Sequence, residues 1–335
     1  MRRSQIPTCY FPSTVLFIDD SRDFLLNFTL QLDDDITCNI VNSPYEALEA
    51  VHKANQIEQV NQRVLTEYLD ANGCPMTNST INLNLGSIHS EVYNPLRFTE
   101  TSVVVIDYAM PGMNGLEVCR KMENSPIKRI LLTGRADEKM AVQAFNDGLI
   151  DMYLQKQNPN ITRLINSSIH TMQMHYFQNM SDVVIKMLSI KSPNCLQDPA
   201  FIKLFNEHVK ENNIVEYYLT ENSGSFLMMD ANAELSHFIV KTEQDLRLHY
   251  EMALDNKAPQ MVLDQLQKGE KVPFFWKADD YNETVWDDWA TYLYPASKLE
   301  GLETYYYSYV KNPPHTDINK DKILSYQKYL DEVDG

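Results

Sequence analysis

Short runs of branched apolar residues recur through the first half of the chain, each followed by a polar or amphipathic stretch. The runs are TVLFI, ITCNIV, VVVI, RILL and MYL, beginning near residues 14, 36, 103, 129 and 152. Continuous apolar runs of this length are typical of strands buried on both faces, and their alternation with helices predicts a parallel sheet. We therefore expect an α/β, doubly wound, five-stranded sheet over residues 13 to 156.

Two longer segments accompany this sheet. Residues 44 to 70 have the composition of a polar helix opening at Pro44, whereas residues 71 to 100 show no clear period and are interpreted as an irregular insertion. From residue 160 to about 190 the chain lacks proline before Pro193, and apolar residues recur at steps of three, four and seven. This spacing predicts one long helix with a coiled-coil-like dimer seam made by Ile165, Ile169, Met172 and Tyr176.

The pattern changes after residue 195. Aromatic, alternating runs predict strands near residues 214–219, 225–229, 234–240, 271–276 and 303–310, with helices near 242–255 and 258–268. These elements predict a smaller α+β domain with a five-stranded antiparallel sheet and helices on one face. The expected organisation is a domain over residues 1–159 with an insertion at about 71–100, a connecting helix over 160–190 and an α+β domain over 195–335.

Charge and composition limit the possible partners. The formal net charge is −17, and residues 195–335 hold 25 acidic against 13 basic side chains, a net charge of −12. Such a charge opposes binding to DNA or anionic lipid, so we expect protein partners and neither direct DNA binding nor membrane association. The five cysteines form no C-x-x-C pair, and no apolar run could span a bilayer or act as a signal peptide. A cytoplasmic protein is the simplest interpretation.

Three acidic side chains follow strands of the predicted parallel sheet. Asp19 and Asp20 come directly after TVLFI, and Asp107 comes directly after VVVI. The carboxyl ends of parallel strands form the crevice where ligands bind in such sheets, so these carboxylates should converge. They would repel one another unless a hard divalent cation lay among them, and Mg²⁺ prefers oxygen ligands. The sequence therefore predicts a magnesium site.

A hydroxyl and an ammonium follow the next two strands. Thr133 ends the run RILL, and Lys156 comes shortly after MYL. Carboxylates, a metal, a hydroxyl and an ammonium together suit phosphoryl transfer onto a carboxylate, with Asp107 as the nucleophile. Taken singly, each residue has an ordinary structural explanation: the acidic pair as a helix cap, Asp107 as a turn residue, Thr133 and Lys156 as solvated or structural side chains. The joint order along successive strands favours the chemical interpretation.

The motifs FIDD, IDYAMPGMNG, ILLTG and MYLQK, in this order, resemble the receiver domain of two-component response regulators, a flavodoxin-like (CheY-like) fold. The resemblance covers about residues 15 to 175 and implies a sensor histidine kinase as phosphoryl donor. It implies that Asp107 accepts the phosphoryl group and that Thr133 and Tyr153 form the switch. It also implies that Lys156 bonds the phosphoryl group. The implied Mg²⁺ ligands are Asp19, Asp20, Asp107 and the backbone carbonyl of Ala109. Two departures stand out: Gln157 follows the lysine where receivers usually have proline, and the insertion before VVVI is long.

The C-terminal part contains EYYLTENSGSFLMMDANAELSHFIVKTEQDLRLHYEMA and VPFFWKADDY, and it resembles a poorly characterised output domain found on response regulators of gammaproteobacteria. This resemblance implies a phosphorelay regulator that responds to a small diffusible signal, as in quorum sensing. No basic recognition helix and no GGDEF, EAL or HD-GYP signature is present, and Trp276, Trp286 and Trp289 are interpreted as core anchors. Two hypotheses remain open for the output. One is a phosphorylation-driven switch of dimerisation and protein interaction. The other is a receiver that controls nucleic-acid or small-ligand binding by a PAS-like domain.

Overall fold

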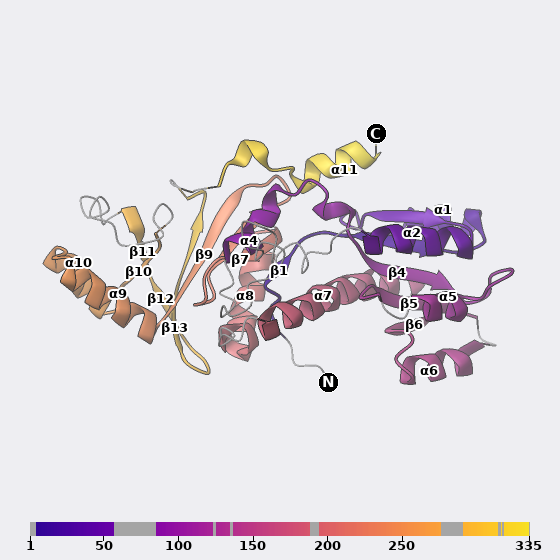
Figure 1. The fold of residues 1–335 in the computed structure, drawn as a ribbon, viewed down its shortest axis with the longest axis horizontal. Helices are drawn as coiled ribbons and strands as arrows, with labels where there is room; N and C mark the ends of the chain where they lie inside the picture. The colour runs from indigo at the N-terminus through magenta and orange to yellow at the C-terminus, as the bar shows by residue number, and fades with distance from the viewer. Residues whose placement is uncertain are drawn as a thin grey trace, which may run out of the picture. The chain divides into compact units, whose positions relative to one another are not determined.

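The computed structural model describes residues 5–56, 85–122, 125–134, 137–187, 194–275, 291–313, 316 and 318–334. The chain divides into two compact units. We call the unit of residues 11–76 and 96–186 the α/β unit, and the unit of residues 1–10, 77–95 and 187–335 the α+β unit (Figure 1). The predicted 160–190 helix therefore belongs mostly to the α/β unit. The first residues of the chain and part of the predicted insertion belong instead to the α+β unit.

The α/β unit contains the predicted five-stranded parallel sheet. Its strand order is β3-β2-β4-β5-β6, and every neighbouring pair is parallel. The strands are β2 (Thr14–Ile18), β3 (Cys38–Val41), β4 (Thr101–Asp107), β5 (Lys128–Thr133) and β6 (Met152–Gln155). The order reverses between β2 and β4, which places a topological switch point at the carboxyl ends of these two central strands.

Helices cover both faces of this sheet. One face packs against α1 (Arg22–Thr29) and α7 (Ile161–Met187). The other packs against α2 (Pro44–Gln56), α5 (Gly115–Lys121) and α6 (Glu138–Asn146). Alternate residues of the central strand β4 point to opposite faces of the sheet. Val103 and Val105 pack in the core beneath α1 and α7, and Val104 and Ile106 pack in the core beneath α2, α5 and α6. Burial on both faces explains why these strands read as continuous apolar runs.

The long helix α7 corrects the predicted dimer seam. Ile165, Ile169 and Met172 are at most 3% exposed and pack in the core with strands of the sheet. Tyr176 is 1% exposed, and its hydroxyl donates a 2.6 Å hydrogen bond to Glu100 in the same unit. The predicted dimer seam is therefore wrong, because three of its side chains pack against the sheet and Tyr176 is buried within the same unit. The side chains of the proposed continuation, Val183 and Met187, lie outside the described residues.

The region predicted as an irregular insertion is partly helical. Residues 57–84 lie outside the described part of the chain. After them come α4 (Leu85–Ser90), a 3₁₀ turn at Glu91–Tyr93 and, in the α/β unit, a second turn at Arg97–Thr99. Ile88 and Val92 are buried at 1% exposure or less, and α4 packs on strand β7 (Ile214–Leu219) of the α+β unit. This segment is therefore part of the core of the α+β unit.

The α+β unit is built on a six-stranded antiparallel sheet of order β1-β7-β8-β9-β13-β12. The predicted meander is confirmed as β7 (Ile214–Leu219), β8 (Phe226–Asp230) and β9 (Leu235–Thr242), and the last predicted strand is β13 (Thr304–Lys311). Two edge strands extend it: β1 (Cys9–Tyr10), which pairs with β7, and β12 (Ser297–Glu300), which pairs with β13. The predicted 271–276 strand is β10 (Lys271–Pro273), which pairs with β11 (Leu293–Pro295) in a separate two-stranded sheet.

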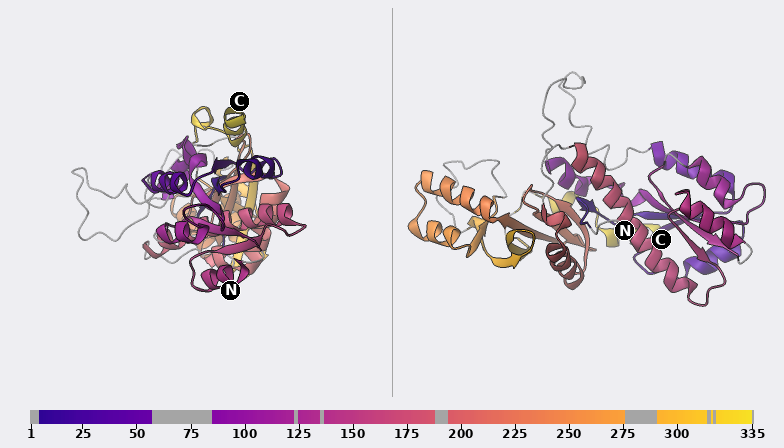
Figure 2. Two further views of the ribbon diagram at one scale, coloured as in Figure 1. Left: turned by 90° about the vertical axis from the view of Figure 1, so that its right-hand side faces the viewer. Right: turned by 90° about the horizontal axis from the view of Figure 1, so that it is seen from below.

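Helices complete this unit. The two predicted helices are confirmed as α9 (Glu243–Asp255) and α10 (Gln260–Gln267), which pack together and are drawn in orange in Figure 2. Two further helices are α8 (Pro199–Glu211) and α11 (Tyr326–Asp334). Phe201 and Phe205 of α8 contact Phe238 of β9, so α8 covers one face of the sheet. The three tryptophans lie outside the described residues.

Candidate functional site at the carboxyl ends of β2 and β4

Two neighbouring strands bring Asp19 and Asp107 to the same edge of the parallel sheet. Ile18 of β2 pairs with Ile106 of β4, so the next residue of each strand is an aspartate at the switch point. Asp19 and Asp107 are only 2% and 5% exposed, whereas Asp20 is exposed. Carboxylate oxygens of these three residues all lie within 4.8 Å of one another. The structure thus brings together the three acidic side chains that the sequence singled out.

Lys156 supplies the cation of this cluster. Its Nζ atom lies 2.6 Å from Oδ2 of Asp19 and 2.9 Å from Oδ1 of Asp107. Burial raises the pKa of the Asp107 carboxyl above its ordinary value, and the Lys156 ammonium opposes that rise through a hydrogen bond and its charge. A second carboxylate, Asp19, adds to the rise in the pKa of Asp107. The carboxylate of Asp107 is thus desolvated and yet held beside a positive charge.

The backbone around the two aspartates fixes their side chains. Oδ1 of Asp19 accepts a 2.9 Å hydrogen bond from the N–H of Ser21, the residue that caps α1. The Asp107 carboxylate accepts a hydrogen bond from the N–H of Ala109. Gly115, the first residue of α5, passes so close to Asp107 that a Cβ atom there would collide with the Asp107 carbonyl oxygen. The glycine therefore allows α5 to start directly beside the end of β4.

Thr133 and Tyr153 lie on the two strands beyond β4. Thr133 is fully buried, its hydroxyl donates a 3.4 Å hydrogen bond to the Leu154 carbonyl, and its own carbonyl accepts from the N–H of Lys156. Tyr153 is half-buried, and its ring meets Phe145 of α6 edge-on with centroids 6.3 Å apart. The sequence placed both residues on the correct strands. In this structure the Thr133 hydroxyl is engaged with β6.

The donor set of this edge fits a hard divalent cation. Three carboxylates whose oxygens lie within 4.8 Å of one another are the kind of ligand that Mg²⁺ binds, together with water or a carbonyl oxygen such as that of Ala109. Receiver domains in general bind Mg²⁺ at such an acidic pocket. The cluster therefore fits the expected cofactor in its chemistry and in its position on the fold.

One neighbour of the site was missed by the sequence analysis. The Phe24 ring lies against the Lys156 ammonium, with Nζ 4.6 Å from the ring centroid. The signal available in the sequence was weak, because Phe24 follows the acidic pair by only four residues and reads as part of the apolar face of α1. Its approach to a lysine more than 130 positions away emerges only from the fold.

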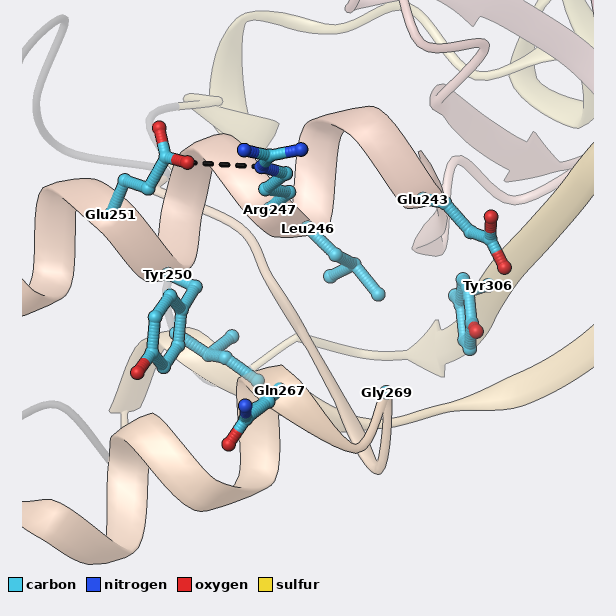
Figure 3. A pocket seen from close by; sticks show the side chains of 9 residues that line it. Glu243, Leu246, Arg247, Tyr250, Glu251, Gln267, Gly269 and Tyr306 are labelled. Carbon is cyan, nitrogen blue, oxygen red and sulfur yellow. Dashed lines mark hydrogen bonds and ion pairs between the residues drawn. The ribbon is translucent and has the colours of Figure 1, made fainter.

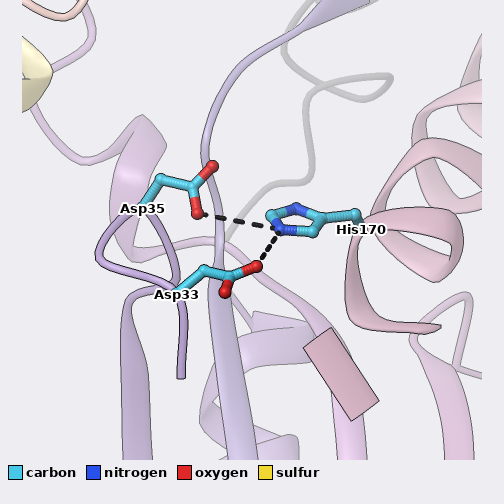
Figure 4. A group of neighbouring side chains, drawn as sticks. All are labelled: Asp33, Asp35 and His170. Carbon is cyan, nitrogen blue, oxygen red and sulfur yellow. Dashed lines mark hydrogen bonds and ion pairs between the residues drawn. The ribbon is translucent and has the colours of Figure 1, made fainter. Parts of the chain in front are cut away.

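A second group of potential metal ligands lies elsewhere in the α/β unit. Asp33 and Asp35, from the loop before β3, face His170 of α7, with His170 Nε2 3.3 Å from Asp33 and 3.7 Å from Asp35 (Figure 4). The side chains of both aspartates are more than half exposed. Asn166, one turn before His170, donates a 2.8 Å hydrogen bond to Asp33. These contacts are sufficient to explain the group as a surface ion-pair cluster between loop and helix.

Comparisons with known proteins identify a family and similar structures for this chain. The family described as "Response regulator receiver domain" matches residues 58–167. The chain is 36% identical over 70 residues to the transcriptional regulatory protein FixJ of Bradyrhizobium diazoefficiens, and this match spans about a third of that relative. It is also similar over almost its whole length to the Legionella pneumophila response regulator LqsR. That similarity has 49% identity, a TM-score of 0.83, and coverage of 99% of this chain and 97% of that one.

The chain belongs to the response regulators. This confirms the resemblance stated from the motifs and extends it over both units, since the likeness to LqsR covers the α+β unit as well. Membership of the family implies, in general, a histidine kinase as phosphodonor partner. Among the described residues, none of the helices combines the length and the hydropathy needed to span a bilayer.

Proposed function

We propose that this response regulator accepts a phosphoryl group on Asp107 from the phosphohistidine of a sensor kinase. An oxygen of the Asp107 carboxylate attacks phosphorus, the O–P bond forms as the P–N bond to the kinase imidazole breaks, and the imidazole nitrogen keeps the electron pair and takes up a proton. The observation that carries this proposal is the juxtaposition of the desolvated Asp107 carboxylate with the Lys156 ammonium at 2.9 Å.

The surrounding residues have complementary roles in this proposal. Asp19, Asp20 and Asp107, with the carbonyl of Ala109, would hold Mg²⁺, which would supply positive charge to the phosphoryl oxygens. Lys156 neutralises a further oxygen from the opposite side. Thr133 leaves the Leu154 carbonyl to bond the phosphoryl group, and Tyr153 then changes its packing against Phe145. Such a movement would convert the covalent change into a change of surface.

A direct experiment tests the acceptor assignment. The full chain is incubated with Mg²⁺ and a small phosphodonor such as acetyl phosphate, and phosphorylated protein is separated by phosphate-affinity electrophoresis. Asp107→Asn should abolish labelling, whereas the exposed Asp23→Asn should be labelled like the wild type. Full labelling of Asp107→Asn would show that another residue accepts the phosphoryl group. Asp19→Asn and Asp20→Asn should raise the Mg²⁺ concentration needed for half-maximal labelling.

The output of this switch is proposed to be protein association. The net charge of −12 over residues 195–335 disfavours contact with DNA phosphates, which leaves protein partners as the favoured class. Dimerisation remains part of the proposal but needs a surface other than the buried seam. Met140 and Phe145 of α6 are 46% and 48% exposed, and the Phe145 ring contacts Tyr153, so this helix offers an apolar surface beside the proposed switch.

A second candidate function is small-ligand binding by the α+β unit. A cavity of about 400 Å³ lies between α9, α10 and β13 (Figure 3). Leu246 and Leu266 give it apolar walls, and Tyr250 and Tyr306 add aromatic rings. Arg247 and Glu251 form a 3.0 Å ion pair beside it. This volume falls in the range of small-molecule sites, about 300–1,000 Å³.

The cavity can be tested with a matched pair of variants on one helix. Leu246→Trp places a large ring at the cavity lining, whereas Leu248→Trp adds the same ring at a position that is 49% exposed. Saturation-transfer NMR with a panel of small aromatic and aliphatic alcohols should detect binders that Leu246→Trp loses and Leu248→Trp retains. If the two variants bind the same compounds equally well, the cavity is not a ligand site.

A further inference from the structure

The contact between Phe24 and Lys156 links helix α1 to the phosphorylation site. Lys156 Nζ lies 4.6 Å from the centroid of the Phe24 ring, within the distance at which a cation over an aromatic face is attracted. Phe24 itself is anchored: its ring stacks on Phe28 with centroids 5.2 Å apart, and Phe28 packs on Phe17 of β2 at 5.9 Å. The ring beside the ammonium is thus anchored on β2, the strand that Asp19 directly follows.

Lys156 needs such a support. Its ammonium is carried on a flexible four-carbon stem, and the side chain is 23% exposed. The backbone is tied to β5 by the hydrogen bond from the Lys156 N–H to the Thr133 carbonyl at 3.0 Å. The next residue is Gln157, which lacks the fixed φ of a proline, so the backbone after the lysine is less restricted. Restraint of the side chain must therefore come from its own neighbours.

Those neighbours offer the ammonium two carboxylates. Nζ lies 2.6 Å from Asp19 and 2.9 Å from Asp107, and only contact near Asp107 would serve an incoming phosphoryl group. The Phe24 ring lies against the same ammonium, with Nζ 4.6 Å from the ring centroid. It attracts the ammonium without offering a proton acceptor, so the cation keeps its charge and its hydrogen bonds for the oxygens of the site.

We propose that Phe24 is a positioning residue for phosphoryl transfer: its ring face holds the Lys156 ammonium beside Asp107 and replaces restraint that the backbone at Gln157 does not give. The proposal rests on the proposed function of Asp107, and it assigns to α1 a part in the reaction. Phe24→Leu would keep an apolar side chain with good helix propensity but would remove the aromatic ring. Tyrosine would keep the ring face.

A double-mutant cycle tests this relationship. Phosphorylation rates with acetyl phosphate and Mg²⁺ are measured for wild type, Phe24→Leu, Lys156→Gln and the double variant, with Phe24→Tyr as the rescue. Phe24→Leu should lower the rate about fivefold, the factor expected for a cation–π contact of about 1 kcal/mol, and Phe24→Tyr should stay within about twofold of wild type. In the Lys156→Gln background, Phe24→Leu should cause no further loss. An equal loss in both backgrounds would overturn the proposal.

A second readout does not depend on phosphorylation. The side-chain carbons and hydrogens of Lys156, observed by NMR in ¹³C-lysine-labelled full chain and assigned through Lys156→Gln, should show the ring-current shift of a group over an aromatic face. The shift should persist in Phe24→Tyr and vanish in Phe24→Leu. Persistence in Phe24→Leu would refute the contact. If the wild type is not labelled at Asp107, the proposed function is refuted. The contact between Phe24 and Lys156 is then still tested by the NMR shift alone.

Discussion

Lys156 Nζ lies 2.9 Å from Oδ1 of Asp107, so the Lys156 ammonium is paired with the carboxylate proposed to react. The same ammonium is 2.6 Å from Oδ2 of Asp19. It therefore bridges two buried carboxylates that repel each other at the switch point of the sheet. Electrostatic stability of this edge and its chemistry depend on the same side chain.

Lys156→Gln should couple the stability of the α/β unit to Mg²⁺. Removing one partner of a buried ion pair leaves uncompensated charge, so we expect a loss of about 2 kcal/mol in the free energy of unfolding without the metal. Added Mg²⁺ should then raise the melting temperature of this variant more than that of wild type, because the cation relieves a larger repulsion. Scanning calorimetry with and without Mg²⁺ measures both effects.

The control for this variant is Lys139→Gln on helix α6, where the lysine is exposed. It removes the same charge away from the site and should leave both the melting temperature and its response to Mg²⁺ close to those of wild type. An equal Mg²⁺ response in Lys156→Gln and Lys139→Gln would contradict the role assigned to Lys156.

The surface for self-association can be located with two substitutions. Phe145→Glu places a charge on the exposed side of α6 and should weaken phosphorylation-dependent dimerisation while preserving the fold. Ile169→Glu places a charge in the sheet core and should destabilise the monomer by several kcal/mol, on the order of 4 kcal/mol. Sedimentation velocity and circular dichroism on both variants separate the two effects. A well-folded Ile169→Glu protein with lost dimerisation would restore the α7 seam.

The α7 seam shows where sequence patterns stop being informative. A stripe of apolar residues every three or four positions reports that one helix face is covered, but the stripe is the same whether a sheet or a second helix covers it. The central strands β2, β4 and β5 were predictable because their buried apolar runs are continuous. Strand β1, Cys9–Tyr10, has only two residues and pairs with a strand more than 200 positions away, so no local pattern marks it.

Some missed features did leave a local signal. Helix α8 begins after Asp198, whose side chain accepts a hydrogen bond from the Ala200 N–H, and Pro199 occupies its first position. A capping aspartate followed by proline is a recognised helix start, and Phe201 and Phe205 lie one turn apart. The acidic residues and Lys156 of the site were predictable from their order along the strands. Their distances, and the approach of Phe24, require the tertiary fold.

Substitution of Gly269 can test the packing around the cavity of the α+β unit. It has a φ of +65°, and a Cβ atom there would collide with the ring of Tyr306. Gly269→Ala should cost about 2–3 kcal/mol, from left-handed backbone strain plus displacement of the ring. Gly148→Ala is the matched control, because Gly148 has a φ of +71° with no neighbour near the added atom, and it should cost only about 1 kcal/mol. Urea unfolding measures both free energies of unfolding, and equal losses in the two variants would show that the Tyr306 ring moves aside at no cost.

His237 gives the α+β unit a predicted sensitivity to acid. Its side chain on β9 is 4% exposed, its ring lies 4.7 Å from that of Phe274, and neither ring nitrogen has a hydrogen-bond partner among the described residues. Burial lowers the pKa of His237 from 6.5 to about 4. The folded protein therefore keeps this ring neutral at a pH where the unfolded chain already binds a proton. Stability is fully present above pH 6.5 and is lost progressively as the pH falls towards 4.

His237→Leu should remove this acid sensitivity, because leucine fills a similar apolar space and cannot bind a proton. Between pH 7.5 and pH 5, wild type should lose about 2 kcal/mol of unfolding free energy through His237, and the variant should lose less by that amount. Urea unfolding followed by tryptophan fluorescence measures the difference, since all three tryptophans lie in the C-terminal half of the sequence. Ile239→Val, two residues along the strand, should cost about 1 kcal/mol equally at both pH values. The same pH dependence in wild type and His237→Leu would show that protonation of His237 does not destabilise the unit, because the dependence would then persist without its imidazole.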